Sequence, residues 1–418
     1  MKKEVIIVLY GSTGDLTFRK LLPAIIDSYK KEHINNNLLL VALGRRDFTT
    51  DAYLEFVKSH NEKLDIELLK NITEYYKMQI TDKNDYVGLK ELLDQNSSDK
   101  TRVIHYLAVS PELMIDVSNI ISEQKIIEKN NLNQSVIFEK PFGSSYRTAH
   151  KINEELWKNF SEKQIYRIDH YLGKKMVDSI LKLRFENDIL KSVFSPKNLS
   201  SIEIVVKEKD GILNRGSFYD STGAVKDMFQ SHILQIVTLL TMKKPGKFDH
   251  ETIINEKVKV LKQLKYQKET LVFGQYKGYL KETNVNENSL TETLLAVELF
   301  VNNKFKKVPI KVLTGKKLDA KETYIKMNLK DGSSLLLTVN PDSSLLLSTK
   351  ILGENINNRY VFENIEDEYG KLILSAIAFE KEKFLRWDEI ENSWRFVDEL
   401  LTRKKELTIY SPNFREKE

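Results

Sequence analysis

The sequence predicts an α/β protein with an N-terminal Rossmann-type dinucleotide-binding domain and a second, α+β domain with a large, mainly antiparallel sheet. Two observations lead to this fold class. Up to about residue 170, apolar strands alternate with helical segments, and a glycine turn follows the first strand. After that point, strands follow one another with little helix between them. The predicted domains are residues 1–169 and 170–418.

The first domain begins with a strand, a turn and a helix. Val5–Tyr10 is a short apolar run rich in β-branched residues, which indicates a strand buried on both faces of a parallel sheet. Helical patterning from Leu16 to about Lys31 and a second apolar run at Leu38–Leu43 complete a βαβ unit. The alternation continues with the strands Val103–Val109 and Ser135–Phe138 and the helix Met114–Ile121.

The second domain is predicted from strands that alternate apolar and polar residues. This alternation is typical of an antiparallel sheet with one face on the core. Two helical segments, 366–378 and 390–401, are expected to cover one face of that sheet. The predicted strands are Ile202–Val206, Leu294–Val301, Val308–Leu313, Tyr324–Leu329, Ser334–Val339 and Ser344–Ser348.

Composition narrows the functional class. The chain has 418 residues and a net charge of +5 from 65 basic and 60 acidic side chains, which gives no reason to expect nucleic acid as a partner. The absence of cysteine excludes disulfides, thiolate zinc sites and cysteine nucleophiles, and no metal is expected. No apolar run is long enough for a membrane span, and Val5–Tyr10 is too short for a secretion signal. A cytoplasmic protein without a membrane partner is therefore expected.

The turn after the first strand predicts a dinucleotide site. Its glycines permit a tight turn and a close approach of the backbone to pyrophosphate, which the N–H groups at the start of the helix can bind. Thr17 stands where the usual pattern has a third glycine. The predicted cofactor-binding residues of the turn are Gly11, Ser12, Thr13, Gly14, Asp15 and Leu16.

The end of the second strand indicates which dinucleotide binds. Sites for NAD carry an acidic residue there, which binds the ribose 2′-hydroxyl. In this chain Arg45 and Arg46 occupy the position instead, and guanidinium groups can bind a 2′-phosphate through two hydrogen bonds. NADP is therefore the predicted cofactor, with NAD as an alternative. An ordinary surface position is a stronger competing interpretation for Arg46 than for Arg45.

Two further segments carry candidate ligand-binding groups. The sequence FEKPFG places Lys140 at the carboxyl end of a parallel strand, where ligands bind in such sheets, and Pro141 can fix the turn, including through a cis bond. The sequence RIDHYLGK places His170 and Lys174 four residues apart, on one face of a helix. Together with the hydroxyl of Tyr171, these donors predict a phosphate pocket.

Two candidate residues for chemistry lie further along the chain. The sequence DMFQSH predicts a buried helix that carries His232. Glu208 follows the strand Ile202–Val206 and can accept hydrogen bonds from sugar hydroxyls. Taken alone, such a histidine is more often a core residue than a base, and such a glutamate is more often a surface residue.

The segments GSTGDL, EKPFG, RIDHYLGK, DMFQSH and TGKKL, in this order and spacing, resemble the glucose-6-phosphate dehydrogenase family. The resemblance runs from Val5 to about Val397, and RIDHYLGK is its most diagnostic part. It implies oxidation of D-glucose 6-phosphate to 6-phospho-D-glucono-1,5-lactone with hydride transfer to NADP, the first step of the pentose phosphate pathway. It also implies a homodimer or homotetramer with the large sheet at the contact.

The resemblance implies a role for individual residues. His232 is the expected general base for the C1 hydroxyl, and Asp169 is expected to orient it and to stabilise the imidazolium. Thr13 and Arg45 are expected at the 2′-phosphate end of the cofactor, and Pro111 near the nicotinamide. The expected substrate contacts are His170, Tyr171 and Lys174 to the phosphate, and Lys140, Glu208, Asp227, Lys316 and Lys321 to the sugar side, with Lys140 also close to the cofactor.

Three departures from the family pattern leave the sugar specificity open. Ser231 stands where the family has asparagine, Leu313 stands where it has arginine, and the chain is shorter than typical members. One alternative is an NADP-dependent dehydrogenase of a related hexose 6-phosphate. Another is an inositol or glucose-fructose type of oxidoreductase, which shares Glu-Lys-Pro but lacks RIDHYLGK. A third is a non-catalytic NADP-sensing protein on the same fold, against which the retention of His232 with Asp169 argues.

Overall fold

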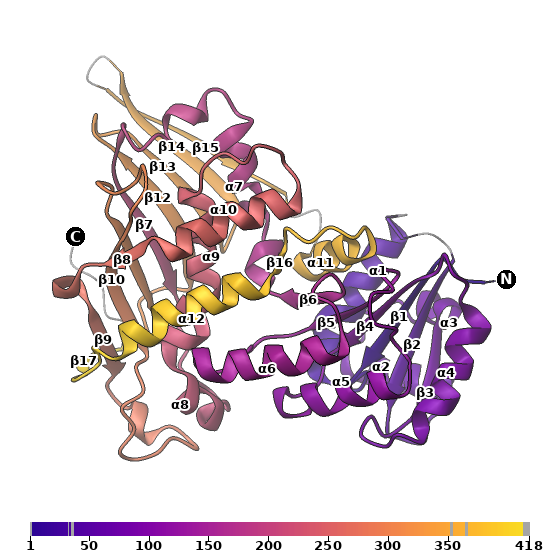
Figure 1. The fold of residues 1–418 in the computed structure, drawn as a ribbon. Helices are drawn as coiled ribbons and strands as arrows, with labels where there is room; N and C mark the ends of the chain where they lie inside the picture. Colours follow the sequence, from indigo (N-terminus) through magenta and orange to yellow (C-terminus); the bar gives the residue numbers. More distant parts are fainter. Residues whose placement is uncertain (1, 32, 35–36, 352–353, 364–366, 413–418) are drawn as a thin grey trace. The chain divides into compact units, whose positions relative to one another are not determined.

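The computed structural model describes residues 2–31, 33–34, 37–351, 354–363 and 367–412. The chain divides into two compact units, neither of which is continuous in sequence (Figure 1). Unit 1 consists of residues 1–143, 147–173 and 365–387, and unit 2 consists of residues 144–146, 174–364 and 388–418. The functional domains 1–169 and 170–418 stay a prediction, since the boundaries of compact units need not coincide with those of functional domains.

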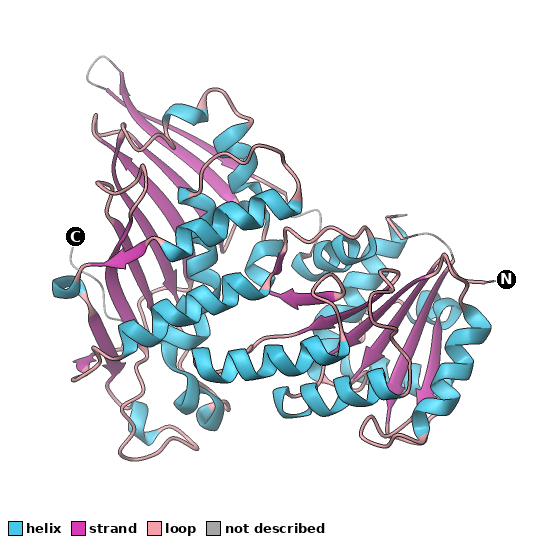
Figure 2. Ribbon diagram, viewed as in Figure 1, coloured by secondary structure: helices cyan, strands magenta, loops and turns pink. Residues whose placement is uncertain are grey.

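Unit 1 is built on a seven-stranded sheet with the order β16-β6-β5-β4-β1-β2-β3. Neighbouring strands are parallel, except that β16 pairs antiparallel with β6. Helices lie on both sides of the sheet (Figure 2), so its strands read as continuous apolar runs. The strands are β1 (Val5–Tyr10), β2 (Leu38–Gly44), β3 (Thr73–Lys77), β4 (Arg102–Leu107), β5 (Gln134–Phe138), β6 (Ile165–Ile168) and β16 (Phe384–Leu385).

The helices of unit 1 follow the predicted alternation with the strands. The longer ones are α1 (Leu22–Lys30), α2 (Thr50–His60), α3 (Ile66–Ile72), α4 (Asp85–Asn96), α5 (Met114–Glu123), α6 (Tyr146–Asn159, whose first residue belongs to unit 2) and α11 (Glu368–Ile377). Short helical segments are η1 (Thr17–Leu21), η2 (Pro111–Leu113) and η3 (His170–Gly173).

The position of α11 corrects one prediction. The segment 366–378 was expected to cover the antiparallel sheet, but Leu372 and Ile373 of α11 lie in the same apolar core as Ile7 of β1 and Leu40 of β2, in unit 1. Residue 366 lies outside the described residues. Apolar periodicity predicts that a helix has a buried face, but it does not say which sheet receives that face.

Charged side chains fix the returning segment that carries α11 and β16 to unit 1. The guanidinium of Arg102, on β4, donates to the carbonyl of Ala376 at 2.7 and 3.2 Å. Arg167, on β6, is 1% exposed and donates to both carboxyl oxygens of Glu162, at 2.6 and 3.0 Å, and to the carbonyl of Leu385. A buried charge is tolerated only when it is paired, so these contacts specify where the segment binds.

Unit 2 is built on a ten-stranded sheet with the order β15-β14-β13-β12-β7-β11-β10-β9-β17, and β8 also pairs with β10. Among the described strands of this sheet, only the pairs β7–β11 and β9–β17 are parallel. The prediction of a mainly antiparallel sheet is therefore confirmed. The strands are β7 (Leu199–Lys207), β8 (Leu264–Tyr266), β9 (Val272–Tyr276), β10 (Leu294–Val301), β11 (Ile310–Gly315), β12 (Glu322–Leu329), β13 (Ser334–Asn340), β14 (Ser344–Ile351), β15 (Glu354–Val361) and β17 (Thr408–Tyr410).

Helices of unit 2 pack on this sheet and on one another. Arg184 of α7 is buried and donates to the carbonyls of Leu239 and Met242 at the end of α9. In α12, Phe396 packs edge-on against Tyr266 of β8, at 5.9 Å between ring centroids. The helical elements are α7 (Lys175–Phe185), η4 (Leu190–Ser192), α8 (Gly216–Ala224), η5 (Val225–Ile233), α9 (Leu234–Thr241), α10 (His250–Lys262), η6 (Lys268–Thr270), η7 (Tyr279–Lys281) and α12 (Trp387–Leu401, whose first residue belongs to unit 1).

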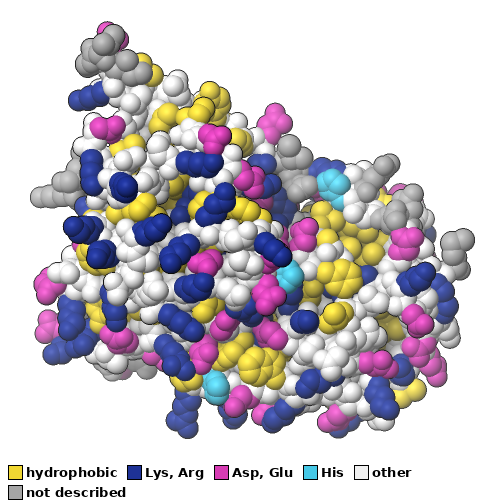
Figure 3. Space-filling view, turned by 45° about the horizontal axis from the view of Figure 1, so that its top comes forward, with side chains coloured by type: hydrophobic (Ala, Val, Ile, Leu, Met, Phe, Trp, Pro, Cys, Tyr) yellow, Lys and Arg dark blue, Asp and Glu magenta, His cyan; other side chains and the backbone are white. Residues whose placement is uncertain are grey.

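The surface carries charges of both signs. On the face that Figure 3 shows, Lys and Arg side chains lie among Asp and Glu side chains, with smaller apolar patches between them. In the part of the chain that the structure describes, no helix combines the length and the apolar character needed to cross a membrane.

A substitution in η3 tests the packing of α11. A Cβ added at Gly173 would lie 2.6 Å from the carbonyl oxygen of Glu368, a backbone atom that cannot move without shifting α11. We expect Gly173→Ala to lower the free energy of unfolding by about 1–3 kcal/mol, as overpacking does, measured by urea denaturation. Gly246→Ala is the matched control, because a Cβ there meets no atom within 4 Å. Equal stability of the two variants would contradict this account of the packing.

Candidate active site

The glycine turn after β1 has the geometry of a dinucleotide-binding turn. Gly11 has a φ of +81°, and a Cβ there would lie 2.3 Å from the carbonyl oxygen of Ala108. The N–H of Gly14 donates to the carbonyl of Gly11 at 3.0 Å, and helical backbone begins at Asp15. The N–H groups at the start of that helix therefore lie at the carboxyl end of β1, where this type of fold binds pyrophosphate.

Two residues of this region are used within the fold. Ser12 is 0% exposed, and both its N–H and its hydroxyl donate to the carbonyl of Leu43, at 3.2 and 2.8 Å. Thr17, in place of the third glycine, is buried, and its hydroxyl donates to the carbonyl of Gly11 at 3.1 Å. The candidate contacts to a dinucleotide therefore come from Thr13, Gly14 and the first helical residues, while Ser12 joins the turn to β2.

The two arginines after β2 differ in what they contact. The guanidinium carbon of Arg46 lies 4.2 Å from the centroid of the Phe56 ring, a cation–π geometry. Among the described residues, none forms an ion pair or a hydrogen bond with the exposed guanidinium of Arg45. The guanidinium of Arg45 is thus the less engaged of the two within the described part of the fold, and its role in phosphate binding stays a prediction.

At the end of β5, Glu139 and Lys140 precede a cis peptide bond to Pro141, which agrees with the sequence prediction for this turn. The hydroxyl of Tyr106 donates to Glu139 Oε1 at 2.5 Å. Burial raises the pKa of Glu139 to about 7, and the charge of Asp169 raises it as well, against the lowering effects of Tyr106 and Lys140. Sequence reasoning assigned Lys140 but missed Glu139, because a glutamate next to a lysine usually indicates a solvated ion pair.

Asp169 and its neighbours form a compact turn after β6. Asp169 is 0% exposed, and one of its carboxyl oxygens accepts from the N–H of Tyr171 at 3.0 Å. Its carbonyl accepts from the N–H of Leu172 at 3.0 Å. The ring of His170 is parallel to that of Tyr369 in α11, at 6.5 Å between centroids. The predicted residues Asp169, His170 and Tyr171 therefore share one rigid turn of unit 1.

In unit 2, the carboxyl ends of two parallel strands bring predicted residues together. Glu208 follows β7 and Lys316 follows β11, and the ammonium of Lys316 lies 2.6 Å from Glu208 Oε2. The two positions coincide because Lys207 is in register with Gly315. This ion pair brings together two residues that were predicted to bind the substrate, although Glu208 taken alone looked like a surface residue.

Tyr219 of α8 completes this cluster and was not predicted. The ammonium of Lys316 lies 4.9 Å from the centroid of its ring. Burial raises the pKa of Tyr219, and the negative charges of Asp227 and Glu208 raise it further. Tyr219 thus lies near Asp227, Glu208 and Lys316 in unit 2. An aromatic residue in a weakly patterned helix gave no signal of this role.

His232 lies in η5, a nine-residue π-helical segment that starts just after a kink at Gly223. The kink has a φ of +69°, and a Cβ there would lie 2.4 Å from Glu292 Oε1, which also accepts from the N–H of Val225 at 3.2 Å. His232 itself is 0% exposed. π-helical segments are rare and frequent at functional sites, so the local backbone supports a role for His232 beyond packing.

Three further predicted residues are described by their place in the chain. Lys174 precedes α7, and Pro111 is exposed at the start of η2. Lys321 is exposed in the loop between β11 and β12, and no described residue forms an ion pair or hydrogen bond with it. That loop is held instead by Lys207, which pairs with Asp319 at 3.2 Å.

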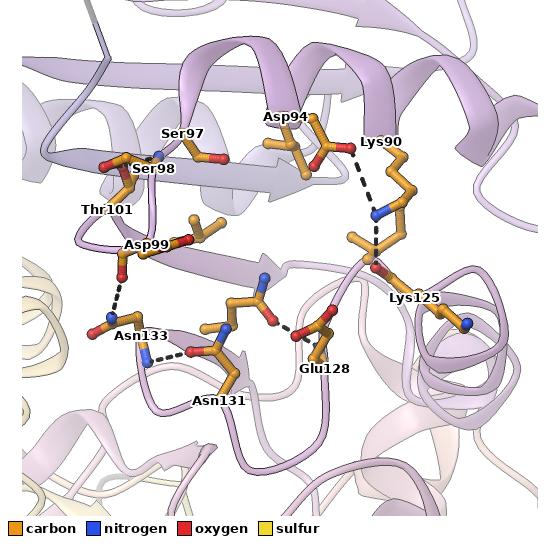
Figure 4. Close-up of a pocket in the computed structure, with 14 residues that line it drawn as sticks. Lys90, Asp94, Ser97, Ser98, Asp99, Thr101, Lys125, Glu128, Asn131 and Asn133 are labelled. Atoms are coloured by element: carbon orange, nitrogen blue, oxygen red, sulfur yellow. Dashed lines mark hydrogen bonds and ion pairs between the residues drawn. The ribbon is translucent and has the colours of Figure 1, made fainter.

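A polar pocket of unit 1 lies away from all the predicted site residues. Figure 4 shows it between α4 and the loops that precede β4 and β5, with Lys90, Asp94, Asn131 and Asn133 among its lining residues. These loops lie at the amino ends of the parallel strands, whereas ligands of such sheets bind at the carboxyl ends. The pocket is therefore not the candidate active site.

Comparisons with known proteins cover the whole chain. The family model for the glucose-6-phosphate dehydrogenase NAD-binding domain matches residues 8–179, and the model for the C-terminal domain of the same family matches residues 181–417. Glucose-6-phosphate 1-dehydrogenase of Borreliella burgdorferi is 35% identical, over 96% of this chain and 92% of its own length. The corresponding protein of Bacillus subtilis is 32% identical, over 98% of this chain and 94% of its own.

A solved structure described as glucose-6-phosphate dehydrogenase in complex with its substrate glucose-6-phosphate is similar over 100% of this chain and 96% of its own, with a TM-score of 0.91 and 28% identity. Both the fold class and the resemblance predicted from the sequence motifs are thereby confirmed. Because a family model covers more than half of the chain and a relative above 30% identity covers nearly all of it, this chain belongs to the glucose-6-phosphate dehydrogenase family.

Proposed function

We propose that this chain oxidises D-glucose 6-phosphate at C1 to 6-phospho-D-glucono-1,5-lactone and that the hydride passes to NADP. The activity follows from membership of the family, whose two domain models match the chain along its length. The observation that carries the assignment of residues is that predicted groups gather in two clusters. Asp169, His170 and Tyr171 share the turn after β6, and Glu208 and Lys316 form an ion pair after the parallel strands β7 and β11. A cytoplasmic location stays a prediction.

The residues around the glycine turn fit NADP. The close approach of Gly11 to Ala108 leaves no room for a side chain, as a turn that cradles pyrophosphate requires. Arg45 supplies a guanidinium for a 2′-phosphate, and no acidic residue stands at the end of β2. When bound, the nicotinamide supplies the acceptor for the hydride.

We assign the proton transfer to His232. Its imidazole takes the proton of the C1 hydroxyl, while the hydrogen on C1 leaves with its electron pair and a C1–O double bond forms. Asp169 orients the imidazole and stabilises the imidazolium, as a buried carboxylate does for a catalytic histidine. His232 is a residue of unit 2 and Asp169 is a residue of unit 1.

The remaining residues bind the sugar phosphate in this proposal. His170, Tyr171 and Lys174 offer donors to the phosphate. The ion pair between Glu208 and Lys316 presents an acceptor and a donor to the sugar hydroxyls, with Asp227 in the same cluster. Lys321, Lys140 and Pro111 remain proposed contacts from the resemblance to the family.

Two departures from the family pattern, Ser231 and Leu313, bear on the sugar specificity. Leu313, where the family has arginine, is buried in an apolar cluster of unit 2 together with Tyr276 and Leu318. It cannot replace the hydrogen bonds of a guanidinium. A related hexose 6-phosphate is therefore the second candidate substrate.

A proposed dimer contact lies on the sheet of unit 2. Side chains alternate along β12 and β13, with one set buried and the other, which includes Tyr324, Lys326 and Leu336, partly exposed and lining a groove. The resemblance implies that homodimers form through this sheet. The exposed set is then the contact face, because α7 packs against β13 from the opposite side.

Replacement of the base should abolish turnover. We expect His232→Ala to lower kcat by about 10²–10⁴-fold, the usual contribution of a general base. The Kd of glucose 6-phosphate should change less than about threefold, because the base acts in the transition state. NADPH absorbance gives kcat, and calorimetry gives Kd. His250→Ala, an exposed histidine at the start of α10, is the control. Normal turnover with lost affinity would refute the role of His232.

The unchanged protein provides the controls for substrate. Turnover on another hexose 6-phosphate but not on glucose 6-phosphate would support the second candidate. Binding of NADP without turnover on any hexose 6-phosphate would support a sensor protein.

Arg45 should determine the choice between cofactors. We expect Arg45→Ala to raise the Kd of NADP roughly 10–100-fold, the value of hydrogen bonds to a charged group, and to leave the Kd of NAD nearly unchanged. Arg46→Ala is the matched control, because that side chain packs on Phe56. Fluorescence titration measures both constants. Equal losses for NADP and NAD would remove the case for Arg45.

A charge on the sheet face should separate the subunits. We expect the unchanged protein to have the mass of two or more chains in solution and Leu336→Asp to shift it to one chain, because an unpaired carboxylate buried in a contact costs several kcal/mol. Size-exclusion chromatography with light scattering gives the mass. Val87→Asp, on the exposed side of α4, is the control. A dimer unaffected by Leu336→Asp would place the contact elsewhere.

A further inference from the structure

Glu139 occupies a central position at the carboxyl end of the parallel sheet. Strands β4, β5 and β6 are neighbours in that order. Tyr106 lies near the end of β4, Glu139 directly follows β5, and Asp169 directly follows β6. Three polar side chains from three adjacent strands are therefore aligned along the edge where ligands of this fold bind.

The contacts of Glu139 hold its carboxyl in one place. Oε1 accepts from the hydroxyl of Tyr106 at 2.5 Å, a short bond of the kind that phenols make with carboxylates. The ring of Tyr106 is itself buried in the core of unit 1. The hydroxyl is therefore fixed, and the carboxyl that it binds is fixed with it.

The groups that face Glu139 carry charges of both signs. Lys140 is the cation beside it, and Asp169 is a second carboxylate on the next strand. Tyr369 of α11 lies near both carboxyl groups. Burial raises the pKa of its phenol, and the negative charges of Glu139, Asp169 and other carboxylates raise it further. The charges of Asp169 and Lys140 thus act on Glu139 in opposite directions.

We propose that Glu139 is a positioning residue of the proton-transfer site: held by Tyr106, its ionised carboxylate adds a negative charge beside Asp169 and so strengthens the base that Asp169 orients. The inference rests on the proposed roles of Asp169 and His232. It adds a group that touches neither substrate nor cofactor in this scheme and that acts through Asp169 and Lys140.

The direction of the effect follows from the charge. The negative charge of Asp169 raises the pKa of Glu139, while the Tyr106 hydroxyl and Lys140 lower it. Glu139, with a pKa raised to about 7 chiefly by burial, is neutral below that pH and charged above it. Its negative charge makes the imidazole of His232 more basic, so turnover should increase as Glu139 loses its proton.

The pH dependence of turnover tests the proposal. We expect kcat of the unchanged protein to rise with pH through two ionisations, one from His232 and one near pH 7 from Glu139. In Glu139→Gln, which keeps the shape and the acceptor for Tyr106, the second rise should be lost. At pH 8 its kcat should be lower by roughly tenfold, which corresponds to one pKa unit of the imidazolium.

A second variant moves the ionisation without removing it. Tyr106→Phe deletes the hydrogen bond that lowers the pKa of Glu139, so the second rise should shift to higher pH. Infrared difference spectra between unchanged protein and Glu139→Gln should show a protonated carboxyl band that disappears near the same pH. Glu123→Gln, an exposed residue of α5, is the control and should keep the profile of the unchanged protein.

Two results would overturn the proposal. One is a Glu139→Gln profile that keeps both ionisations, and the other is a carboxyl band that is already absent well below pH 7. The variant His232→Ala distinguishes a failure of the proposed function. If that variant keeps its turnover, the assignment of His232 as the base is wrong. An altered Glu139→Gln profile would then point to a different proton acceptor near Asp169.

Discussion

The ion pair between the buried Arg167 and the partly exposed Glu162 is the constraint on which the organisation of unit 1 depends. Burial acts to raise the pKa of Glu162, but the charge of Arg167 outweighs it and the pKa is lowered, so the pair is held in ionised form. Glu162 Oε1 also accepts from the N–H of Trp387 at 3.0 Å. Arg167 lies two residues before Asp169, so one pair fixes both the returning segment and the strand that ends in the candidate site. Removal of Glu162 would leave the buried guanidinium of Arg167 without its carboxylate, a loss of about 3–5 kcal/mol.

Both units use parallel strands to align functional groups. In unit 1 all the candidate groups follow carboxyl ends of parallel strands, as in other doubly wound sheets. In unit 2 the sheet is mainly antiparallel, yet Glu208 and Lys316 follow β7 and β11, one of its parallel pairs. Neighbouring antiparallel strands end at opposite edges of a sheet, so an antiparallel β7–β11 pair would have separated the two charges by the length of a strand. The local change in strand direction thus creates this part of the site.

Sequence patterns predicted where helices and strands lie in the chain better than they predicted what those elements pack against. The run Val5–Tyr10, the turn after it and the strand Leu294–Val301 were predicted with the observed bounds, because burial on one or both faces leaves a period that can be read locally. The destination of α11 was wrong, since periodicity does not identify the receiving sheet. β16 has two residues and therefore no period at all. In the candidate site, motif residues such as Asp169 and His232 were found from the resemblance, while Glu139 and Tyr219 owe their importance to neighbours that are distant in sequence.

A charged residue in a buried strand indicates where a distant segment of the chain packs, which apolar periodicity does not. Arg102 lies in a strand with every residue buried, and arginine is almost never buried without a partner. Its partner is a carbonyl of the returning segment. In unit 2, Lys257 of α10 and Glu389 of α12 are both 0% exposed and 2.7 Å apart, so a second buried pair fixes the chain after it leaves unit 1. Apolar faces can pack in several registers, whereas a buried ion pair is satisfied in one. A charged residue inside an otherwise apolar strand should therefore be read as the docking point of a segment from elsewhere in the chain.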